Sequence, residues 1–390
     1  MIARTIIAIV AAIAVAILVI RNAAVFALAD TKPADAVQYW SRHPVAEISA
    51  AMTEIARSAR NRRPVSSSIF AAMADAAAKE PLAPEPYLVR GVQAELAGDG
   101  ELAQRAFEAA QWRDPRSLSA AYFLADRYFK TGDVHHGLRE IAALARLSPN
   151  GPQTVAPYLG AYAKDPANWG ALRALFRSNP DLADPALTGL ASKLDTVPAV
   201  LALADPRQQP SESHWLEPLL STLTQSGRYS DAYSIWLRTT HAAPGELLHD
   251  SAFADHFSPP PFNWSLTSST VGLAERQPGA RLHVIFYGQE DGFLASQLLL
   301  LPPGAYQLSL QLLGDPARAH VLSWSVWCDK AANPIASATV DSFAARPLKF
   351  QVPAGCGAQW LRLAGASSDI SQQTDVTIAN LKLQKQAPDA

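Results

Sequence analysis

Residues 84–117 have the sequence PEPYLVRGVQAELAGDGELAQRAFEAAQWRDPRS, and residues 118–151 continue with LSAAYFLADRYFKTGDVHHGLREIAALARLSPNG. In each segment a Gly-Asp pair, beginning at Gly98 or Gly132, interrupts a helical pattern near its middle. Prolines recur with the same 34-residue period, at Pro81, Pro115 and Pro149. Glycine permits a tight reversal and proline cannot continue a helix, so each segment predicts two helices joined by a short turn. A fixed period of this length is typical of a stacked helix–turn–helix solenoid.

The two helices of the first segment are predicted over residues 85–96 and 101–112. Gly91 and Ala103 fall where these helices face each other, and their small side chains allow a close approach. Phe107 is predicted to fill the space beneath them. The second segment repeats this plan, which predicts a second helical hairpin stacked on the first.

The spacing of small, large apolar and proline residues resembles the tetratricopeptide repeat family. The positions that carry the resemblance in the two clear repeats, 84–117 and 118–151, are Gly91, Ala103, Phe107, Ala110, Pro115, Ala125, Tyr128 and Pro149. A further unit over 213–246 carries it at Ala232, Trp236 and Pro244. The segments 50–83 and 152–212 are degenerate, the first because Arg57 stands where the family has a small residue. The resemblance implies an all-α solenoid over residues 30–248.

Repeats of this family mostly bind proteins or peptides in a groove lined by the first helix of each hairpin. For this chain the resemblance implies that Tyr87, Arg90, Tyr122 and Arg127 line such a groove. The arginines could pair with carboxylates of a partner. Two alternatives stay open: the groove packs against the chain's own C-terminal domain, or these side chains form an ordinary solvated face.

Residues 1–29 predict a membrane signal. Arg4 precedes a run without charge from Thr5 to Ile20, and further apolar residues follow Arg21. The run is short for a membrane span of about 20 residues, unless Arg21 reaches toward the interface. We interpret it as a retained signal anchor that leaves the rest of the chain in the periplasm; the alternative is a signal peptide cleaved near Ala29.

Two cysteines, Cys328 and Cys356, are the only ones in the chain. In an exported protein they predict one disulfide, worth about 3 kcal/mol by the chain-entropy model. The alternative is a pair of buried free thiols. Two cysteines are too few for a structural zinc site, and we expect no metal.

Residues 249–386 predict an antiparallel β-sandwich, because the apolar pattern changes to a period of two. The expected strands are Leu282–Tyr287, Tyr306–Leu312, Leu322–Cys328, Trp360–Leu363 and Val376–Leu383. A Pro-Phe-Asn-Trp opening at 261–264 and a Leu-Pro-Pro-Gly-Ala-Tyr turn at 301–306 resemble the jelly-roll domains of carbohydrate-binding modules and galactose-binding-like sandwiches.

That resemblance implies a face on which aromatic rings stack against sugars. Alternation along the strands places four candidates opposite the expected core residues: Tyr287, Trp327, Trp360 and Arg362. The alternative is that these residues form a second layer or pack against the helices.

Composition and motifs argue against other classes. A length of 390 residues predicts two or three domains. The residues are 49% hydrophobic and 17% charged, and the net charge of −2 argues against a nucleic-acid partner. The sequence contains no zinc-protease, P-loop, nucleophile-elbow or dinucleotide motif. Asp250, Asp255 and His256 are close in sequence, as in many polar loops. We therefore expect neither an enzyme nor a cofactor.

The overall prediction is a multidomain chain, α then β, with an N-terminal transmembrane helix, a repeat solenoid and a C-terminal sandwich. This combination resembles accessory proteins of envelope or exopolysaccharide assembly and export. The leading hypothesis is a membrane-anchored periplasmic scaffold for protein partners of the cell envelope. The second is a carbohydrate-binding protein, with polysaccharide as its ligand, and the third a polysaccharide-modifying enzyme.

Overall fold

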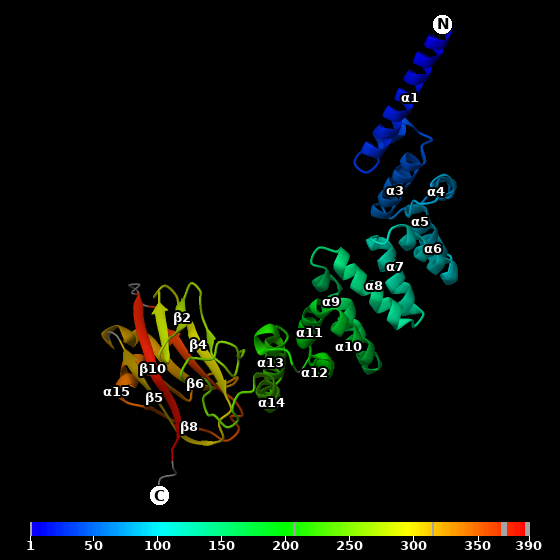
Figure 1. Ribbon diagram of the computed structural model, residues 1–390. Coiled ribbons are helices and arrows are strands. Elements are labelled where there is room, and N and C mark those ends of the chain that lie inside the picture. The colour runs from blue at the N-terminus through cyan, green and yellow to red at the C-terminus, as the bar shows by residue number, and fades with distance from the viewer. Residues whose placement is uncertain (1, 206, 314–315, 368–372, 387–390) are drawn as a thin grey trace. The chain divides into compact units, whose positions relative to one another are not determined.

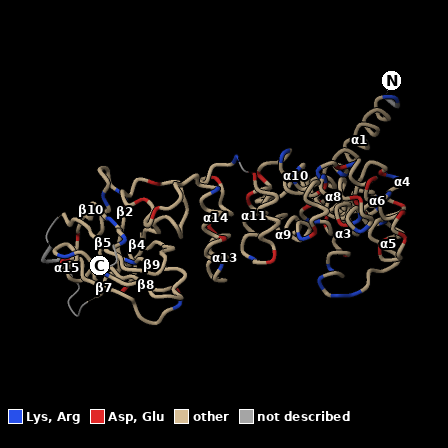
Figure 2. Tube along the Cα trace, turned by 90° about the horizontal axis from the view of Figure 1, so that it is seen from below, with Lys and Arg blue, Asp and Glu red and all other residues tan. Residues whose placement is uncertain are grey.

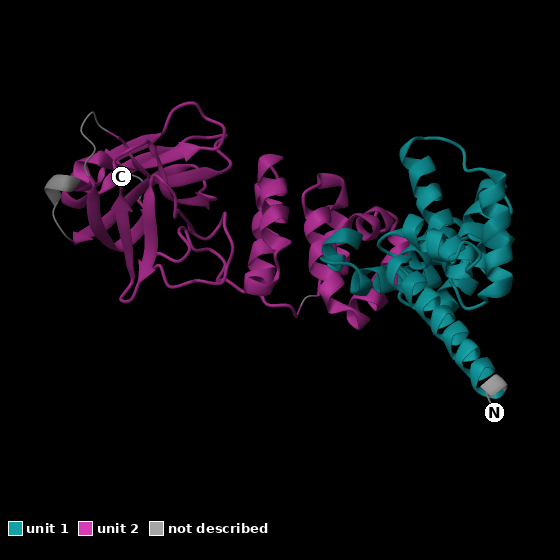
Figure 3. Cartoon of the chain, turned by 90° about the horizontal axis from the view of Figure 1, so that it is seen from above, with its two compact units in different colours: residues 1–155 teal, residues 156–390 magenta. Residues whose placement is uncertain are grey.

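The computed structural model describes residues 2–205, 207–313, 316–367 and 373–386. Helices occupy the first part of the chain and two antiparallel sheets the last, so the fold class is α then β, as predicted (Figure 1). Two compact units divide the chain, residues 1–155 and 156–390 (Figure 3). We call them the helical unit and the C-terminal unit.

The helical unit consists of successive helices joined by short turns. They are α1 (Ile2–Leu28), α2 (Pro33–Tyr39), α3 (Pro44–Arg60), α4 (Ser67–Lys79), α5 (Glu85–Leu96), α6 (Gly100–Arg113), α7 (Leu118–Lys130) and α8 (Val134–Leu147). The boundary between the units falls within α9 (Gly151–Tyr162). The helices α5 to α8 form the two hairpins of the regular repeat.

The reversal inside each hairpin has a local cause. Gly98 and Gly132 adopt φ values of +79° and +78°, which favour glycine. The next residue caps the following helix: the Asp99 side chain accepts a 3.0 Å hydrogen bond from the Leu102 amide, and Asp133 accepts one of 3.2 Å from the His136 amide. The Gly-Asp pair thus ends one helix and begins the next.

The close approach of α5 and α6 depends on a small residue facing a large one. A Cβ atom on Gly91 would lie 2.3 Å from the Phe107 ring, which is fully buried. Phe107 also stacks on Phe123 of α7, with centroids 4.8 Å apart and planes 6° apart. One ring therefore joins the two helices of its own hairpin and the first helix of the next.

Charged residues connect helices at their surfaces, within one hairpin and between hairpins. Lys79 of α4 pairs with Glu47 of α3 at 3.3 Å, and Lys130 of α7 pairs with Glu95 of α5 at 3.1 Å. Basic and acidic residues are mixed along the helices (Figure 2). Each exposed pair of this kind contributes less than about 1 kcal/mol to the stability of the fold, so packing of the apolar faces contributes most of it.

The C-terminal unit begins with shorter helices. They are α10 (Trp169–Ser178), α11 (Ala183–Ala191), α12 (Val197–Leu203), α13 (Leu216–Gln225) and α14 (Tyr229–Thr240). Three 3-10 turns between α9 and α12 begin after Asp165, Asn179 and Lys193. They interrupt the 34-residue register that α5 to α8 keep.

Two five-stranded antiparallel sheets form the sandwich. Sheet A has the order β1-β4-β9-β6-β7 and sheet B the order β2-β3-β10-β5-β8. The strands are β1 (Ser265–Leu266), β2 (Gly272–Gln277), β3 (Arg281–Phe286), β4 (Gly292–Leu299), β5 (Gly304–Leu313), β6 (Leu322–Cys328), β7 (Ala336–Thr339), β8 (Leu348–Val352), β9 (Gln359–Gly365) and β10 (Thr374–Lys385). The short helix α15 (Val340–Ala345) follows β7.

The inner faces of the sheets bury a core that includes Trp264, Phe286, Tyr306, Trp324 and Phe343. The five strands expected from alternation correspond to β3, β5, β6, β9 and β10. Of the other five strands, β1 and β7 are short and β4 is irregular. In β4 a bulge between Phe293 and Ala295 turns both Leu294 and Ala295 inward, which breaks the period of two.

Cys328 at the end of β6 and Cys356 before β9 are joined by a disulfide with a Cα separation of 5.5 Å. Buried Gln359 stabilises the same corner. Its side chain accepts a 2.8 Å hydrogen bond from the Leu301 amide and donates one of 2.7 Å to the Cys356 carbonyl. The disulfide and the glutamine together fix the loop that leads into β9.

The helices nearest the sandwich belong to the same compact unit as the sandwich. The sequence places a domain boundary at residue 249, where the apolar period changes, whereas the compact units divide at 155/156. Two contacts join α14 to the sandwich: the Trp236 indole of α14 donates a 3.0 Å hydrogen bond to the Pro259 carbonyl, and the Tyr233 ring packs edge-on against Phe262. Trp236, assigned to the repeat pattern from sequence, is therefore buried against the sandwich as well.

We predict that Gly91→Ala destabilises the helical unit by about 1–3 kcal/mol, because the added methyl group overlaps a ring that cannot move away. Thermal unfolding of the full chain in detergent, followed by circular dichroism, measures the effect. The matched control is Gly170→Ala in α10, where an added Cβ meets nothing within 4 Å. It should be neutral or stabilising by about 0.5–1 kcal/mol. Equal melting curves for the two variants would contradict the packing described.

Candidate functional site

One line of polar residues crosses the outer face of sheet A. Ser296 of β4 lies opposite Arg362 of β9, which in turn lies opposite Ser325 of β6. Ser265 of β1 and Ser337 of β7 extend the line to both edges. We call these five residues the serine row. Neighbouring strands lie about 4.8 Å apart, so the row spans about 19 Å.

Aromatic residues flank the serine row on the same face. Trp360 and Trp327 are cross-strand partners on one side, and Phe293 lies opposite Ala364 on the other. Residues two apart on a strand point to the same side of a sheet, so Trp360, Arg362 and Ala364 all face outward. Their neighbours Leu361 and Leu363 are fully buried in the core. The face thus carries a central cation between rings.

The guanidinium of Arg362 is held by those rings. Its Cζ lies 4.7 Å from the Phe293 centroid and 5.2 Å from the Trp360 centroid, both within the range of cation–π contacts. Within the described ranges, Arg362 makes no hydrogen bond or ion pair. Burial lowers the pKa of Arg362, and the charge of Asp329 opposes this shift. An arginine remains charged under such conditions, so this face presents a cation whose donors are free to bind a ligand.

Helix α14 closes one edge of the face. The Trp360 indole donates a 2.9 Å hydrogen bond to Asp329 Oδ1, and the Tyr229 hydroxyl of α14 donates to the other oxygen of the same carboxylate. Burial, together with the hydrogen bond to Asp329, raises the pKa of Tyr229 to about 12. Both carboxylate oxygens of Asp329 therefore accept a hydrogen bond, and Trp360 is half-buried.

Among the described residues, no element covers the opposite edge of the face. A depression of about 330 Å³ lies there, lined by Phe293, Ser323, Ala364 and the backbone around Gly365. Asp291 stands at its rim and accepts hydrogen bonds of 2.7 Å from the Ser367 amide and 2.6 Å from the Ser367 hydroxyl. Those hydrogen bonds lower the pKa of Asp291, which keeps it ionised and fixed in position.

The structure brings together three of the four residues expected on a ligand face: Trp327, Trp360 and Arg362. Tyr287 follows β3 in sheet B, where its amide donates to the Val271 carbonyl, and it does not belong to the serine row. Phe293, which is 49% exposed, was missed. The strand β4 that carries it does not alternate, so its outward residues could not be separated from its inward ones.

The four residues expected to line a groove on the repeats have different surroundings. Arg127 pairs with Glu95 at 3.9 Å and packs against Gly100, and the Arg113 guanidinium covers the Tyr87 ring at 3.6 Å from its centroid. Arg90 of α5 and Tyr122 of α7 are exposed, Tyr122 by 49%. Only these last two present their side chains openly to a partner.

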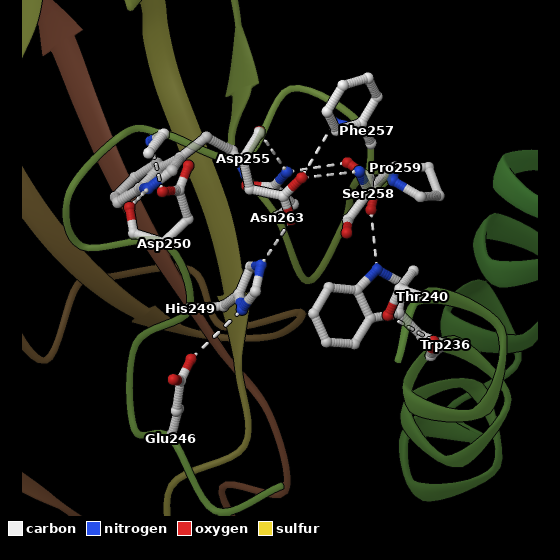
Figure 4. Close-up of polar contacts among 12 residues, drawn as sticks. Trp236, Thr240, Glu246, His249, Asp250, Asp255, Phe257, Ser258, Pro259 and Asn263 are labelled. Atoms are coloured by element: carbon white, nitrogen blue, oxygen red, sulfur yellow. Dashed lines mark hydrogen bonds and ion pairs between the residues drawn. The ribbon is translucent and has the colours of Figure 1, made fainter. Parts of the chain in front are cut away.

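A polar cluster connects α14 to the sandwich (Figure 4). His249 Nε2 lies 2.9 Å from Asp255 Oδ2, and His249 Nδ1 lies 3.3 Å from Glu246 Oε2. The His249 ring also meets the Trp236 ring edge-on at 4.8 Å. His256, next to Asp255 in the sequence, is exposed, and it is His249 that contacts Asp255.

Asp255 organises the loop in this cluster. Burial alone would raise the pKa of Asp255, but hydrogen bonds from Ser258, His249 and two backbone amides lower it overall. Buried Asn263 donates to the carbonyls of Asp255 and Ser258, at 3.0 Å and 2.8 Å. Two strand residues join the cluster as well: Arg276 of β2 donates to Asn263 Oδ1 at 3.2 Å, and Gln297 of β4 donates to the His249 carbonyl at 3.0 Å. These contacts tie the loop to the strands and to α14, so we assign this cluster a structural role.

No family model matches the chain, and no curated protein matches it. The search of solved structures found a chain described as "MamA RS-1 ArsTM double mutant", with 15% sequence identity and a TM-score of 0.24. The match covers 50% of this chain and 92% of that one. A TM-score this low carries no argument about fold or function.

His283, on the outer face of sheet B, lies between two carboxylates. Its Nδ1 is 3.1 Å from Glu275 Oε1 and its Nε2 is 2.8 Å from Asp375 Oδ1. The carboxylates face opposite nitrogens, so the three side chains cannot converge on one ion, and the described residues hold no cluster suited to a metal. Burial alone would lower the pKa of His283, but the hydrogen bonds to Glu275 and Asp375 raise it above the usual 6.5.

We predict a pH-dependent loss of stability in His283→Gln. A raised pKa in the folded state stabilises the fold fully below pH 6.5, and this contribution disappears as pH rises through the folded-state pKa. The variant should therefore lose up to about 1 kcal/mol at pH 5.5 and almost nothing at pH 9. Thermal unfolding at both pH values measures this. The control His256→Gln should show no such difference, and an equal loss at both pH values would contradict the ion pairs.

Proposed function

We propose that this protein is a membrane-anchored scaffold that holds a protein partner on its helical repeats. The observation that carries the proposal is the pair of stacked hairpins, α5 to α8, which leave Arg90 and Tyr122 exposed. Stacked hairpins bury their apolar faces against each other, so the outer residues of the first helices are available to a partner. We further propose that the chain acts by binding and not by catalysis.

The anchor in this proposal is α1. Its segment Arg4–Leu28 is the one helix in the described chain long and apolar enough to cross a membrane, with a mean hydropathy of 2.6. A helix of 27 residues is about 40 Å long, more than the hydrocarbon core of about 30 Å. The large apolar side chains from Ile6 to Ile20 are exposed to solvent, as expected of a segment whose natural surroundings are lipid.

The last turns of α1 support retention of this helix over cleavage near Ala29. Val25 is fully buried with Ala36 and Ala46, and the Arg21 guanidinium donates to the Tyr39 carbonyl at 3.0 Å. Asn22 Oδ1 lies 3.0 Å from the His43 ring. Cleavage near Ala29 would remove these contacts from the folded helical unit, whereas an anchor that continues into that unit keeps them.

The compartment and pathway belong to the same proposal. A disulfide between Cys328 and Cys356 suits an oxidising compartment, which for a bacterial inner-membrane protein is the periplasm. We propose that the partners are proteins of the cell envelope and that the pathway is the assembly or export of envelope polysaccharide or exopolysaccharide. This pathway is an analogy from the pairing of repeats with a sandwich.

We predict that the double substitution Arg90→Glu with Tyr122→Ala abolishes partner capture, because it reverses a charge and removes an exposed ring where partners would bind. A photo-crosslinker placed in α7 should give at least about tenfold less crosslinked adduct in the double variant than in the chain without the two substitutions, measured in intact cells. The control is Arg105→Glu on α6, a 65% exposed arginine on the second helix of the hairpin. An unchanged adduct in the double variant would refute the proposed surface.

A second function is supported by the face of sheet A. We propose that the serine row and its flanking rings bind a saccharide. Pyranose rings stack on aromatic side chains and exchange hydrogen bonds with hydroxyl groups, and both kinds of group are present here on one face. The open depression beside Phe293 has room for a sugar ring.

We predict that Phe293→Ala weakens saccharide binding about tenfold, since a stacked ring is worth about 1 kcal/mol beyond its buried area. Trp360 and Trp327 lie on this face and make intrinsic fluorescence a direct readout. The control is Phe257→Ala, which removes another exposed phenyl ring from the loop before β1. Equal titration curves for the wild type and Phe293→Ala would exclude this face as the binding site.

A further inference from the structure

We infer that the face of sheet A recognises a saccharide that carries a carboxylate, such as a chain containing hexuronate residues, and that Arg362 selects for that carboxylate. The inference rests on the proposed saccharide function and names its ligand class. It starts from the charge of Arg362, which no acid of the described chain neutralises by direct contact. Asp329 is occupied by Trp360 and Tyr229 and acts on Arg362 only through space.

A half-buried guanidinium without a partner loses part of its hydration and receives no protein hydrogen bond in return. Its planar fork of N–H donors matches the two oxygens of a carboxylate. Phe293 and Trp360 hold it from two sides, so little side-chain entropy remains to be lost when a ligand binds. The geometry therefore provides a pre-formed carboxylate receptor.

The residues around Arg362 specify what carries the carboxylate. Ser296 lies beside it on β4, and its hydroxyl can both donate and accept, whereas Ser325 on β6 is buried. Ser325 Oγ accepts a 2.8 Å hydrogen bond from the Trp327 indole, so the hydroxyl proton of Ser325 points away from that indole. An accessible hydroxyl beside a cation, with a phenyl ring at the edge, matches a polyhydroxylated ring that bears one acidic group.

Other anionic polymers fit this face less well. A phosphodiester chain presents one charge per residue and binds through several cations, whereas the serine row contains Arg362 as its one charged residue. Asp291 at the rim of the depression would repel a second anion placed there. The face therefore suits a ligand with widely spaced charges, as in a polysaccharide with a single acidic sugar per repeat.

The test compares neutral xylo-oligosaccharides that carry a single glucuronate residue with the same oligosaccharides after methyl esterification, which removes the charge and keeps the ring. Isothermal titration uses the full chain in detergent. We expect the acidic form to bind at least about tenfold more tightly than the ester, the effect of one charge-assisted bidentate contact. Arg362→Gln should abolish that preference while leaving weak binding of both forms. Arg281→Gln, which changes an exposed arginine on sheet B, should leave the preference unchanged.

The outcomes separate the two proposals. Equal binding of acid and ester by the wild type overturns the carboxylate inference and leaves the saccharide function standing. Binding of neither form overturns both. An unchanged acid preference in Arg362→Gln places the carboxylate site elsewhere and overturns the inference. Because the wild-type comparison of acid with ester needs no variant, the inference remains falsifiable even where Arg362→Gln does not fold.

Discussion

The register of β9 between β4 and β6 is the constraint on which the candidate site depends. Leu361 and Leu363 are fully buried in the sandwich core, so Trp360 and Arg362 must point outward. A slip of one residue would exchange these two sets and bury a guanidinium among apolar side chains, at a cost of several kcal/mol. Core packing thus fixes the position of the cation, and the disulfide and Gln359 at the start of β9 oppose any shift along the strand.

Helix α14 determines which part of that face stays open. Tyr229, Tyr233 and Trp236 follow one another at helical spacing, and each has a contact on the sandwich. Their contacts cover the side of Trp360 and leave Phe293 and the depression free. The helix therefore acts as one wall of the site, and the loop organised by Asp255 and Asn263 holds it there.

The sequence predicts those parts whose signals are local. Gly98 with Asp99 marks the turn between α5 and α6, and strict alternation marks β6, because each signal lies within a few residues. The bulge in β4 removes such a signal, so Phe293 was missed although it forms one side of the Arg362 contact. Nor could the sequence show that Trp236 meets His249 and Phe262, since this pairing depends on how a helix docks on a loop. That no acidic residue in the described ranges contacts Arg362 likewise depends on cross-strand register.

The two proposed functions reinforce each other physically. A shallow face with one cation and a few hydroxyls gives only modest affinity for a single sugar, because much of the ligand stays in contact with water. A chain held at a membrane and bound to a protein partner meets a nearby polymer at a high effective concentration, so weak contacts suffice for retention. Weak contacts also allow release as the polymer moves past. A deep pocket would bind more tightly but would hold the polymer in place, and a shallow face on a sheet is better suited to a chain in transit.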